Sequence, residues 1–306
     1  MLTRQWMRRA LGGRWPGEPR RLAERASQVS GDPLLAVAVS GRGLVQPGEP
    51  VLAADDEGFT RGRAAFETMR VYGGRPFRFQ QHVTRLVNSA ERIGLERPDR
   101  TEIEHLCALA LEHAQSPDAV LRLYWTPGRP GGEHCAIALV GEIPAWIEET
   151  RAHGQRLVSL LQQRRSEPWL LPATKSTSYA VSMAAEAEAK ARGADDAVFV
   201  DADTIVLEGP VTNIWWREGD VLVTPSLEVG ILAGETRAAL LELAAASGQA
   251  VEEGVYPLER LLAADEVFTS SSVREIIPVV SVDGHPFARG PAAASLQRAL
   301  REEAGR

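Results

Sequence analysis

The chain has 306 residues, of which 44% are apolar and 25% charged, so it suits one large or two medium globular domains and excludes wholesale disorder. Its net charge of −7 comes from an acidic body, which argues against nucleic acid as the main partner. No apolar run approaches the roughly 18 residues of a membrane-spanning helix, and two cysteines are too few for a disulfide framework, so we expect a cytoplasmic protein that does not enter a membrane.

Residues 1–33 hold seven arginines against three acidic residues, together with scattered Trp and Pro. No long apolar segment follows the arginines, so a secretory signal is not expected. A transit peptide, a basic tail and an early start codon all stay open for this segment. We predict a basic, poorly ordered extension over 1–33, a small α+β domain over 34–145 and a larger α+β domain over 150–306.

The first domain is predicted to contain both strands and helices. A strand and turn begin near Leu35, and residues 66–79 predict a β-hairpin because two β-rich runs flank Gly73-Gly74. Residues 80–93 predict a helix, since apolar residues recur there at spacings of three and four. The remaining elements expected are a second helix and two strands, over 100–115, 120–125 and 135–140.

The second domain is predicted to begin with a strand after the polar stretch that follows Pro144. A helix is expected to begin at Lys175 and to end near Arg192, with Gly193 as its stop. A β-meander follows, and a glycine-rich turn then leads into a helix that begins at Glu235. The strands of the meander read DDAVFV, TIVLEG, TNIWW and VLVTP. A strand, a loop of serines and another strand are expected in EVFTSSSVREIIPVV.

Arginine supplies 32 of the 34 basic residues, and the only lysines are Lys175 and Lys190. Arg cannot replace Lys where a neutral amine must attack a carbonyl, because a guanidinium does not deprotonate in proteins. Lys190 is explained as a solvated helix charge, since Glu186 lies one turn before it. Lys175 has no such partner and lies between a loop and a helix, so either it survived by chance or it serves as an amine nucleophile.

A Schiff-base lysine that carries pyridoxal phosphate needs a carboxylate at the pyridine nitrogen, a phosphate site and a cavity for the substrate. Glu208 is a candidate carboxylate, although strand-end glutamates are more often exposed. The helix start at 235–237 and the serines at 270–272 are candidates for the phosphate, since free N–H groups and hydroxyls bind anions. An ordinary capped helix and a plain polar loop are the alternatives, and spacing alone does not decide between them.

Other chemistries fit the sequence less well. His105, Cys107 and His113 share one predicted helix, but no further ligand has the spacing of a zinc site, so no metal is expected. The sequence has no G-x-S-x-G nucleophile elbow and no G-x-x-x-x-G-K-[ST] phosphate loop. Serine hydrolysis and P-loop nucleotide hydrolysis are therefore not expected.

Five motifs in a fixed order resemble the class IV, or fold-type IV, pyridoxal-phosphate enzymes. They read DDEGFTRGRAAFETMRVYGGRPFRFQQHVTRL, TKSTSY, EAKARGADDAVFVDADTIVLEGPVTNIWW, TPSLEVGILAGETR and FTSSSVREIIPVVSVDG. The resemblance extends from about Leu35 to Pro286. It implies an α+β fold of two domains with pyridoxal 5'-phosphate (PLP) between them, an amino-acid-like substrate and a homodimer.

The resemblance also implies roles for individual residues. Lys175 would be the Schiff-base lysine and proton shuttle, and Glu208 would pair with the pyridine nitrogen. Arg85 would bind the phosphate, although its place off the apolar face of its helix suggests by itself a solvated arginine. Arg122 matches a position that can contact the substrate carboxylate in some branched-chain members. Further phosphate contacts would come from Glu235, Thr236, and Ser271 or Ser272.

Three departures from the family pattern bear on the reaction. Ser178 replaces the Asn of K-S-x-N, and Pro210 removes a backbone donor after Glu208. Thr68 stands where branched-chain aminotransferases usually carry Gly, and it resembles the lyase pattern, in which a threonine near the cofactor assists elimination. The leading hypothesis is therefore 4-amino-4-deoxychorismate lyase, which makes p-aminobenzoate and pyruvate.

Two other hypotheses stay open. The first is an amino-acid aminotransferase, acting on branched-chain amino acids, D-amino acids or (R)-amines. The second is a non-catalytic relative that keeps the fold as a scaffold. Lys175 argues against the scaffold, because a binding protein with so few lysines would tolerate arginine at that position.

Overall fold

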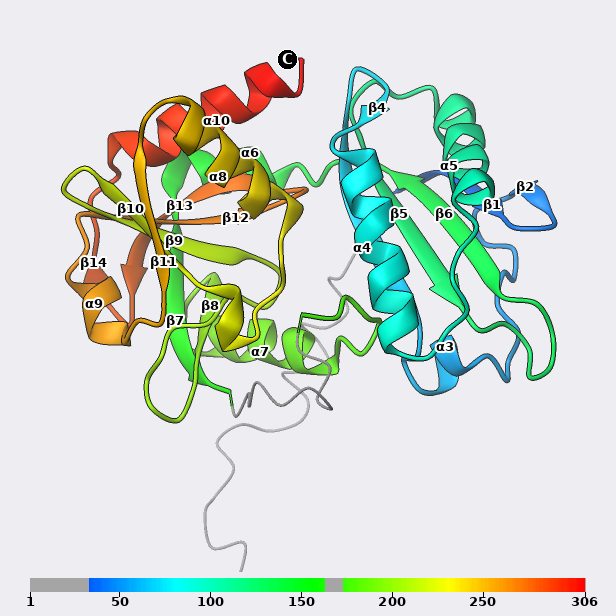
Figure 1. The fold of residues 1–306 in the computed structure, drawn as a ribbon, viewed down its shortest axis with the longest axis horizontal. Coiled ribbons are helices and arrows are strands. Elements are labelled where there is room, and N and C mark those ends of the chain that lie inside the picture. Colours follow the sequence, from blue (N-terminus) through cyan, green and yellow to red (C-terminus); the bar gives the residue numbers. More distant parts are fainter. Residues whose placement is uncertain (1–32, 163–172, 306) are drawn as a thin grey trace, which may run out of the picture. The chain divides into compact units, whose positions relative to one another are not determined.

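The computed structural model describes residues 33–162 and 173–305. All but the last residue of the predicted N-terminal extension, 1–33, lies outside the described residues. A single compact unit begins at Leu34, and it contains two separate sheets that follow each other along the chain, each accompanied by helices (Figure 1). This mixture of helices and sheets confirms the predicted α+β class.

The first sheet has six strands, all paired antiparallel. The strands are β1 (Leu34–Val39), β2 (Gly43–Val45), β3 (Ala65–Tyr72), β4 (Arg75–Pro76), β5 (Ala119–Thr126) and β6 (Cys135–Gly141), and the accompanying helices are α3 (Glu57–Thr60), α4 (Phe79–Arg92) and α5 (Arg100–Ala114). Their order in the sheet is β2-β1-β6-β5-β3-β4. Helices α4 and α5 cover one face, and a shared apolar core lies beneath them (Figure 1).

The local signals in this half predict its elements well. The β3–β4 hairpin turns at Gly73 and Gly74, whose φ angles of 54° and 78° are the left-handed values that a two-residue type I′ turn requires. Helix α4 buries Val83, Leu86 and Ala90 in one stripe, as the spacing predicts. These contacts fix α4 against β3, the strand that the candidate site depends on.

The second sheet has eight strands and mixed pairing. The strands are β7 (Gln155–Leu161), β8 (Asp196–Val200), β9 (Asn213–Glu218), β10 (Val221–Pro225), β11 (Ala250–Gly254), β12 (Glu266–Ser271), β13 (Glu275–Val282) and β14 (His285–Pro286), and the helices are α6 (Trp146–His153), α7 (Ala180–Ala191), α8 (Glu235–Ala246), α9 (Leu258–Leu262) and α10 (Pro291–Glu303), with a 3₁₀ turn, η2, at Leu227–Val229. The strand order is β11-β10-β9-β12-β13-β7-β8, and β14 pairs with β13.

The predicted β-meander in this half is confirmed in two local pairings and wrong in its continuous order. The DDAVFV and TIVLEG segments pair antiparallel around the predicted turn at Asp201, with Val200 opposite Val206, and β9 and β10 form the other expected hairpin. β8 and β9 are separated in the sheet by β12, β13 and β7, so the two pairs are not neighbours as a meander requires. The TIVLEG segment makes two isolated bridges, from Val206 to Val200 and from Ile205 to Pro257, instead of a strand. Its backbone groups bond to two different neighbours, and sequence adjacency alone could not reveal that order.

The predicted start of the helix at Lys175 is also wrong, because α7 begins only at Ala180. The backbone around Lys175 bonds instead to the residues at the start of β3. The Phe66 N–H donates to the Lys175 carbonyl at 3.2 Å, and the Thr177 N–H donates to the Ala64 carbonyl at 2.9 Å. These bonds hold the lysine in an irregular segment beside the first sheet.

The polar stretch after Pro144 forms helix α6, which packs against β13. In the centre of the second sheet, Trp215 and Trp216 are both fully buried. They point to opposite faces of β9, and each belongs to a separate apolar core. β9 is therefore held rigidly from both faces. Among the described residues, none of the helices is long and apolar enough to cross a membrane.

Candidate active site

Lys175 is anchored by residues of the first sheet and its helix. Its backbone N–H donates to the Ser89 hydroxyl on α4 at 3.2 Å, and its carbonyl accepts from Phe66. The amine nitrogen Nζ lies 4.3 Å from the centre of the Phe66 ring. Tyr124 and Tyr179 pack on the same ring, with centroid distances of 5.8 and 5.2 Å. The amine thus lies against the face of the Phe66 ring, which is packed against two tyrosine rings.

The surroundings of Lys175 favour its neutral form. Burial lowers the pKa of its amine to about 8, and the charge of Arg85 adds to this effect, while Glu67 and Glu208 oppose it. A neutral amine is the nucleophile that attack on a carbonyl requires. Lys190, in contrast, is exposed on α7, in agreement with its interpretation as a solvated helix charge.

Glu208 is buried, with 6% of its surface exposed, so the alternative of an exposed strand-end carboxylate is wrong. Its Oε2 accepts a hydrogen bond from the Leu232 N–H at 3.1 Å and one from Asn213 Nδ2 at 3.5 Å. Asn213 Nδ2 also donates to the Leu232 carbonyl at 3.0 Å. Because Asn213 begins the rigid strand β9, these bonds hold the Glu208 carboxylate in one orientation.

Arg85 is not the solvated arginine that its position on the helix suggested. Its side chain is 11% exposed, and its Nε and Nη2 each donate to a Glu67 oxygen at 2.7 Å. Its Nη1 donates to the Ala233 carbonyl at 2.6 Å. The guanidinium therefore links α4 to the loop that precedes α8, and its Nη2 also lies 3.4 Å from His82 Nδ1.

Glu67 and His82 are residues that sequence reasoning missed. Glu67 is fully buried on β3, and His82 Nδ1 lies 2.7 Å from its Oε2. Burial opposes ionisation, but the charge and hydrogen bonds of Arg85 and the contact with His82 hold the pKa of Glu67 to about 2. One signal was available: His82 lies three residues before Arg85, which places both on the same helix face.

The loop before α8 brings Glu208, Arg85 and the start of the helix together. Gly234 is the N-cap of α8, and a Cβ at this position would collide with Asn213 Oδ1, so only glycine permits the close approach. Glu235 Oε1 lies 3.9 Å from Arg85 Nε, and Thr236 is buried in the first turn. The predicted residues Arg85, Glu208, Glu235 and Thr236 therefore lie around one loop.

Ser271, the last residue of β12, and Ser272 lie at the tight turn between β12 and β13. Ser270, directly before them, pairs with Asn213 across the β9–β12 ladder and accepts a hydrogen bond from Trp215 Nε1 at 3.0 Å. The turn is thus at the same end of the sheet as Asn213. The Ser271 hydroxyl accepts from the Arg274 N–H at 3.4 Å.

Thr68 and Arg122 are directly opposite each other on β3 and β5. Both are partly buried. Because alternate residues of a strand share a face, Thr68 is on the same face of β3 as Phe66, whose ring contacts the Lys175 amine. The structure therefore places these two predicted residues on the same side of the first sheet as the lysine.

Comparison with known proteins identifies the family. A family model for amino-transferase class IV matches residues 64–282. The chain belongs to this family. It is 32% identical to a bifunctional aminodeoxychorismate lyase / D-amino acid transaminase from Mycobacterium tuberculosis, over 85% of this chain and 95% of the relative. It is 30% identical to an aminodeoxychorismate lyase from Bacillus subtilis, over 87% and 94%.

Solved structures of class IV aminotransferases share the fold. A hypothetical aminotransferase from Mycobacterium tuberculosis in its PLP-bound form matches with a TM-score of 0.84 and 31% identity, over 88% of this chain and 98% of that one. The resemblance noted in the sequence is thereby confirmed. The protein is a PLP-dependent enzyme of class IV, so the hypothesis of a non-catalytic scaffold is not supported.

The residues of this class IV site fit PLP. They offer an amine with a lowered pKa, a buried carboxylate, a guanidinium beside the loop that precedes α8, and the start of that helix. Three buried hydroxyls have no hydrogen-bond partner among the residues that the structure describes, and they belong to Thr174, Thr177 and Thr212. Two of them flank Lys175, and the third lies in the loop after Glu208. No group of His, Cys, Asp and Glu in the described ranges is arranged to hold a metal ion.

Proposed function

We propose that this class IV enzyme is a 4-amino-4-deoxychorismate lyase, which converts its substrate into p-aminobenzoate and pyruvate. The observation that carries the proposal is the place of Thr68, one alternation along β3 from the Phe66 ring that contacts the Lys175 amine. A hydroxyl at this position is available for proton delivery. The names of two relatives, from Mycobacterium tuberculosis and Bacillus subtilis, support the same activity.

The proposed roles are those that the family resemblance implies, and the contacts described above support them. Lys175 binds the aldehyde of PLP as a neutral amine, and Glu208 holds a proton on the pyridine nitrogen. Arg85 and the first turn of α8, with Glu235 and Thr236, bind the phosphate, and Ser271 or Ser272 adds a hydroxyl. PLP, when bound, supplies an electron sink for the bonding electrons released at the substrate carbon. Arg122 orients a substrate carboxylate.

The chain's own groups then move two protons. The Lys175 amine accepts the proton from the ring carbon that bears the substrate amine. The carbon–oxygen bond to the enolpyruvyl group breaks, the ring becomes aromatic, and a proton delivered from the side of Thr68 converts the leaving group into pyruvate. The reaction is redox-neutral and needs no second substrate.

A second candidate function is amino-acid transamination. Arg122 lies opposite Thr68, where a guanidinium suits the carboxylate of an amino acid or keto acid. The name of the Mycobacterium tuberculosis relative includes D-amino acid transaminase beside lyase. Transamination differs from the lyase reaction in one measurable way, since it stops after one half-reaction until a keto acid is supplied.

The test is a substrate comparison with the PLP-loaded enzyme. Without any keto acid, aminodeoxychorismate is expected to yield p-aminobenzoate and pyruvate in equal amounts over many turnovers. D-alanine and branched-chain amino acids are assayed in parallel, with and without 2-oxoglutarate. Turnover of these amino acids that depends on the keto acid, with no pyruvate formed from aminodeoxychorismate, would replace the lyase proposal by transamination.

A matched pair of variants tests Thr68. Thr68→Val is nearly isosteric and removes only the hydroxyl, so pyruvate release is expected to fall while PLP stays bound. Thr84→Val removes an exposed hydroxyl on α4 and serves as the control. Equal pyruvate release by both variants would contradict the role of Thr68.

We also propose that residues 34–145 and 150–306 act as two domains with PLP between them, in a cytoplasmic homodimer. The contacts that support a site between them are those of Arg85, which reaches from α4 to the loop before α8. Analytical ultracentrifugation of the PLP-loaded protein measures the oligomeric state. A monomer with full activity would contradict the homodimer.

A further inference from the structure

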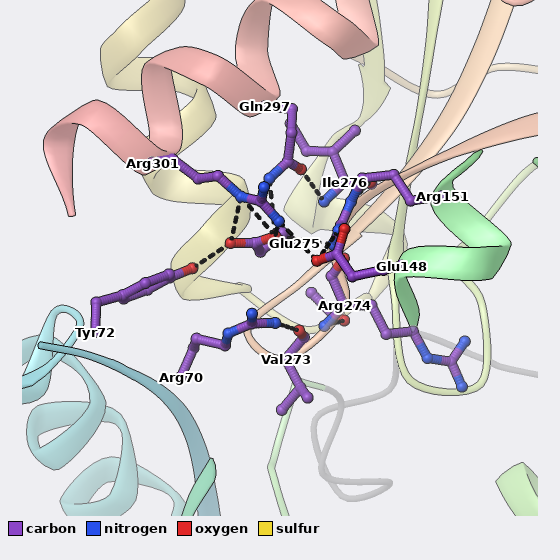
Figure 2. Close-up of polar contacts among 11 residues, drawn as sticks. Arg70, Tyr72, Glu148, Arg151, Val273, Arg274, Glu275, Ile276, Gln297 and Arg301 are labelled. Carbon is purple, nitrogen blue, oxygen red and sulfur yellow. Dashed lines mark hydrogen bonds and ion pairs between the residues drawn. The ribbon is translucent and has the colours of Figure 1, made fainter. Parts of the chain in front are cut away.

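A buried carboxylate outside the proposed catalytic groups draws four segments of the chain together. Glu275 begins β13 and is fully buried. Its Oε1 accepts a hydrogen bond from the Tyr72 hydroxyl of β3 at 2.7 Å, and its Oε2 accepts from Gln297 Nε2 of α10 at 2.8 Å (Figure 2). Arg301 of α10 and Arg151 of α6 also contact Oε2, at 2.7 and 2.8 Å.

Two of these side chains, together with Arg70 of β3, bind the backbone around the turn that precedes Glu275. Arg70 Nη1 donates to the Val273 carbonyl at 2.8 Å, and Arg151 Nη2 donates to the Arg274 carbonyl at 2.7 Å (Figure 2). Gln297 Oε1 accepts from the N–H of the residue after Glu275 at 3.0 Å. Groups from β3, α6 and α10 therefore hold the shape of the turn over 271–274, which contains the two proposed phosphate-binding serines.

The conformation at Glu275 needs this support. Its φ of 55° is in the left-handed region, which residues other than glycine adopt rarely and which persists where the surroundings hold it. Burial opposes ionisation of the carboxylate, but hydrogen bonds from Arg301 and Tyr72 and the charges of Arg70 and Arg151 hold its pKa to about 2. The carboxylate is thus charged at neutral pH.

Strand β3 connects this cluster with the lysine. Every second residue of β3 lies on the same face of the strand, and successive residues on that face are about 6.6 Å apart. This face carries Phe66, Thr68, Arg70 and Tyr72. The first of them contacts the Lys175 amine, and the last two reach Val273 and Glu275. One rigid strand therefore sets both the place of the amine and the place of the turn.

We propose that Tyr72, Arg70 and Glu275 are positioning residues that hold the 271–274 turn where its hydroxyl and backbone N–H groups bind the phosphate of PLP. The inference rests on the proposed function, because it takes this turn as part of the phosphate site. It assigns to the cluster a role beyond joining the elements of the fold. The two roles differ in what they predict for a ligand that lacks the phosphate.

The first experiment compares the binding of PLP and of pyridoxal to the apoprotein by quenching of tryptophan fluorescence. Tyr72→Phe keeps the ring and removes only the hydrogen bond to Glu275. We expect the dissociation constant of PLP to rise about three- to tenfold, because the variant loses part of the free energy of one hydrogen bond to a charged group. The dissociation constant of pyridoxal should change by less than about twofold. Arg70→Met is expected to shift the ratio in the same direction.

Two control variants separate positioning from general stability. Tyr256→Phe alters another buried tyrosine, and Arg260→Met removes the ion pairs with Glu218 and Glu252 that join β9, α9 and β11. Tyr256 packs against Trp216, and Arg260 pairs with Glu218 and Glu252, so both changes affect contacts other than those that hold the turn. The ratio of the two dissociation constants is expected to stay at the wild-type value in both controls. Equal weakening of PLP and pyridoxal in Tyr72→Phe, or no change in either, would overturn the proposal.

The second experiment needs no cofactor. Hydrogen–deuterium exchange of the apoprotein is measured for peptides over 268–280 and, as a reference, over β9. Faster exchange in Tyr72→Phe confined to the first peptide supports the positioning role, and an unchanged rate there refutes it. A wild-type protein that fails to bind PLP would refute the proposed function instead, which keeps the two failures distinguishable.

Discussion

Replacement of Glu67 by glutamine tests the buried ion pair beneath the proposed phosphate site. The change keeps the shape of the side chain and removes the charge that Arg85 faces through two hydrogen bonds of 2.7 Å. Removal of one partner from a buried ion pair leaves an uncompensated buried charge, which costs about 3–5 kcal/mol. The Glu235 carboxylate, 3.9 Å from Arg85 Nε, compensates part of that charge, so the lower end of this range is expected.

The pKa of Glu67 leads to the same magnitude. Its surroundings lower it from the ordinary value of 4.5 to about 2, a difference worth about 3 kcal/mol of folding free energy at neutral pH. A carboxyl group with a lowered pKa contributes this stability above pH 4.5, and the contribution is lost as the pH falls toward 2. The difference between wild type and Glu67→Gln should therefore shrink below pH 4.5.

The assay is urea unfolding of the apoprotein, followed by tryptophan fluorescence at a series of pH values. Glu188→Gln is the control, because Glu188 forms an exposed pair with Arg192 at 2.8 Å, and such pairs contribute less than about 1 kcal/mol. A loss below about 1 kcal/mol for Glu67→Gln at pH 7 would refute the reasoning. A loss of the same size at pH 7 and pH 3 would refute the assignment to ionisation.

Three further predictions concern the cofactor. Lys175→Ala should leave no borohydride-reducible attachment of PLP by mass spectrometry, whereas Lys190→Ala should retain it, and a reducible link in the first variant would disprove the assignment. Glu208→Gln should lower turnover at least about tenfold and change PLP affinity less than about threefold, because the variant leaves the proposed phosphate contacts intact; lost PLP affinity with full turnover of the loaded fraction would contradict this. The rate of PLP capture by the apoprotein, followed by absorbance, should rise with pH through about 8, where half of the Lys175 amine is neutral, and level off about one pH unit higher; a rate that keeps rising to pH 10 would contradict the lowered pKa.

Several features of this protein follow from the sequence alone, because their causes are local. The stripe on α4 and the two glycines of the β3–β4 turn predict their elements through spacing and backbone freedom within a few residues. The near absence of lysine draws attention to Lys175, since only an amine can do the chemistry that arginine cannot. The ordered motifs indicate the class IV family, and the comparisons confirm it.

Other features depend on residues that meet only in the folded chain. Arg85 looks solvated from its helix position, and it is buried because Glu67 approaches from β3. The order of β8 and β9 depends on pairing between strands far apart in sequence, which no local pattern encodes. Glu275 reads as one polar residue after a serine loop, and only tertiary structure brings to it Tyr72, 203 residues away along the chain, and Arg301, 26 residues away. Local periodicity determines where the elements form, and the long-range charge contacts of buried groups determine which of their side chains share a site.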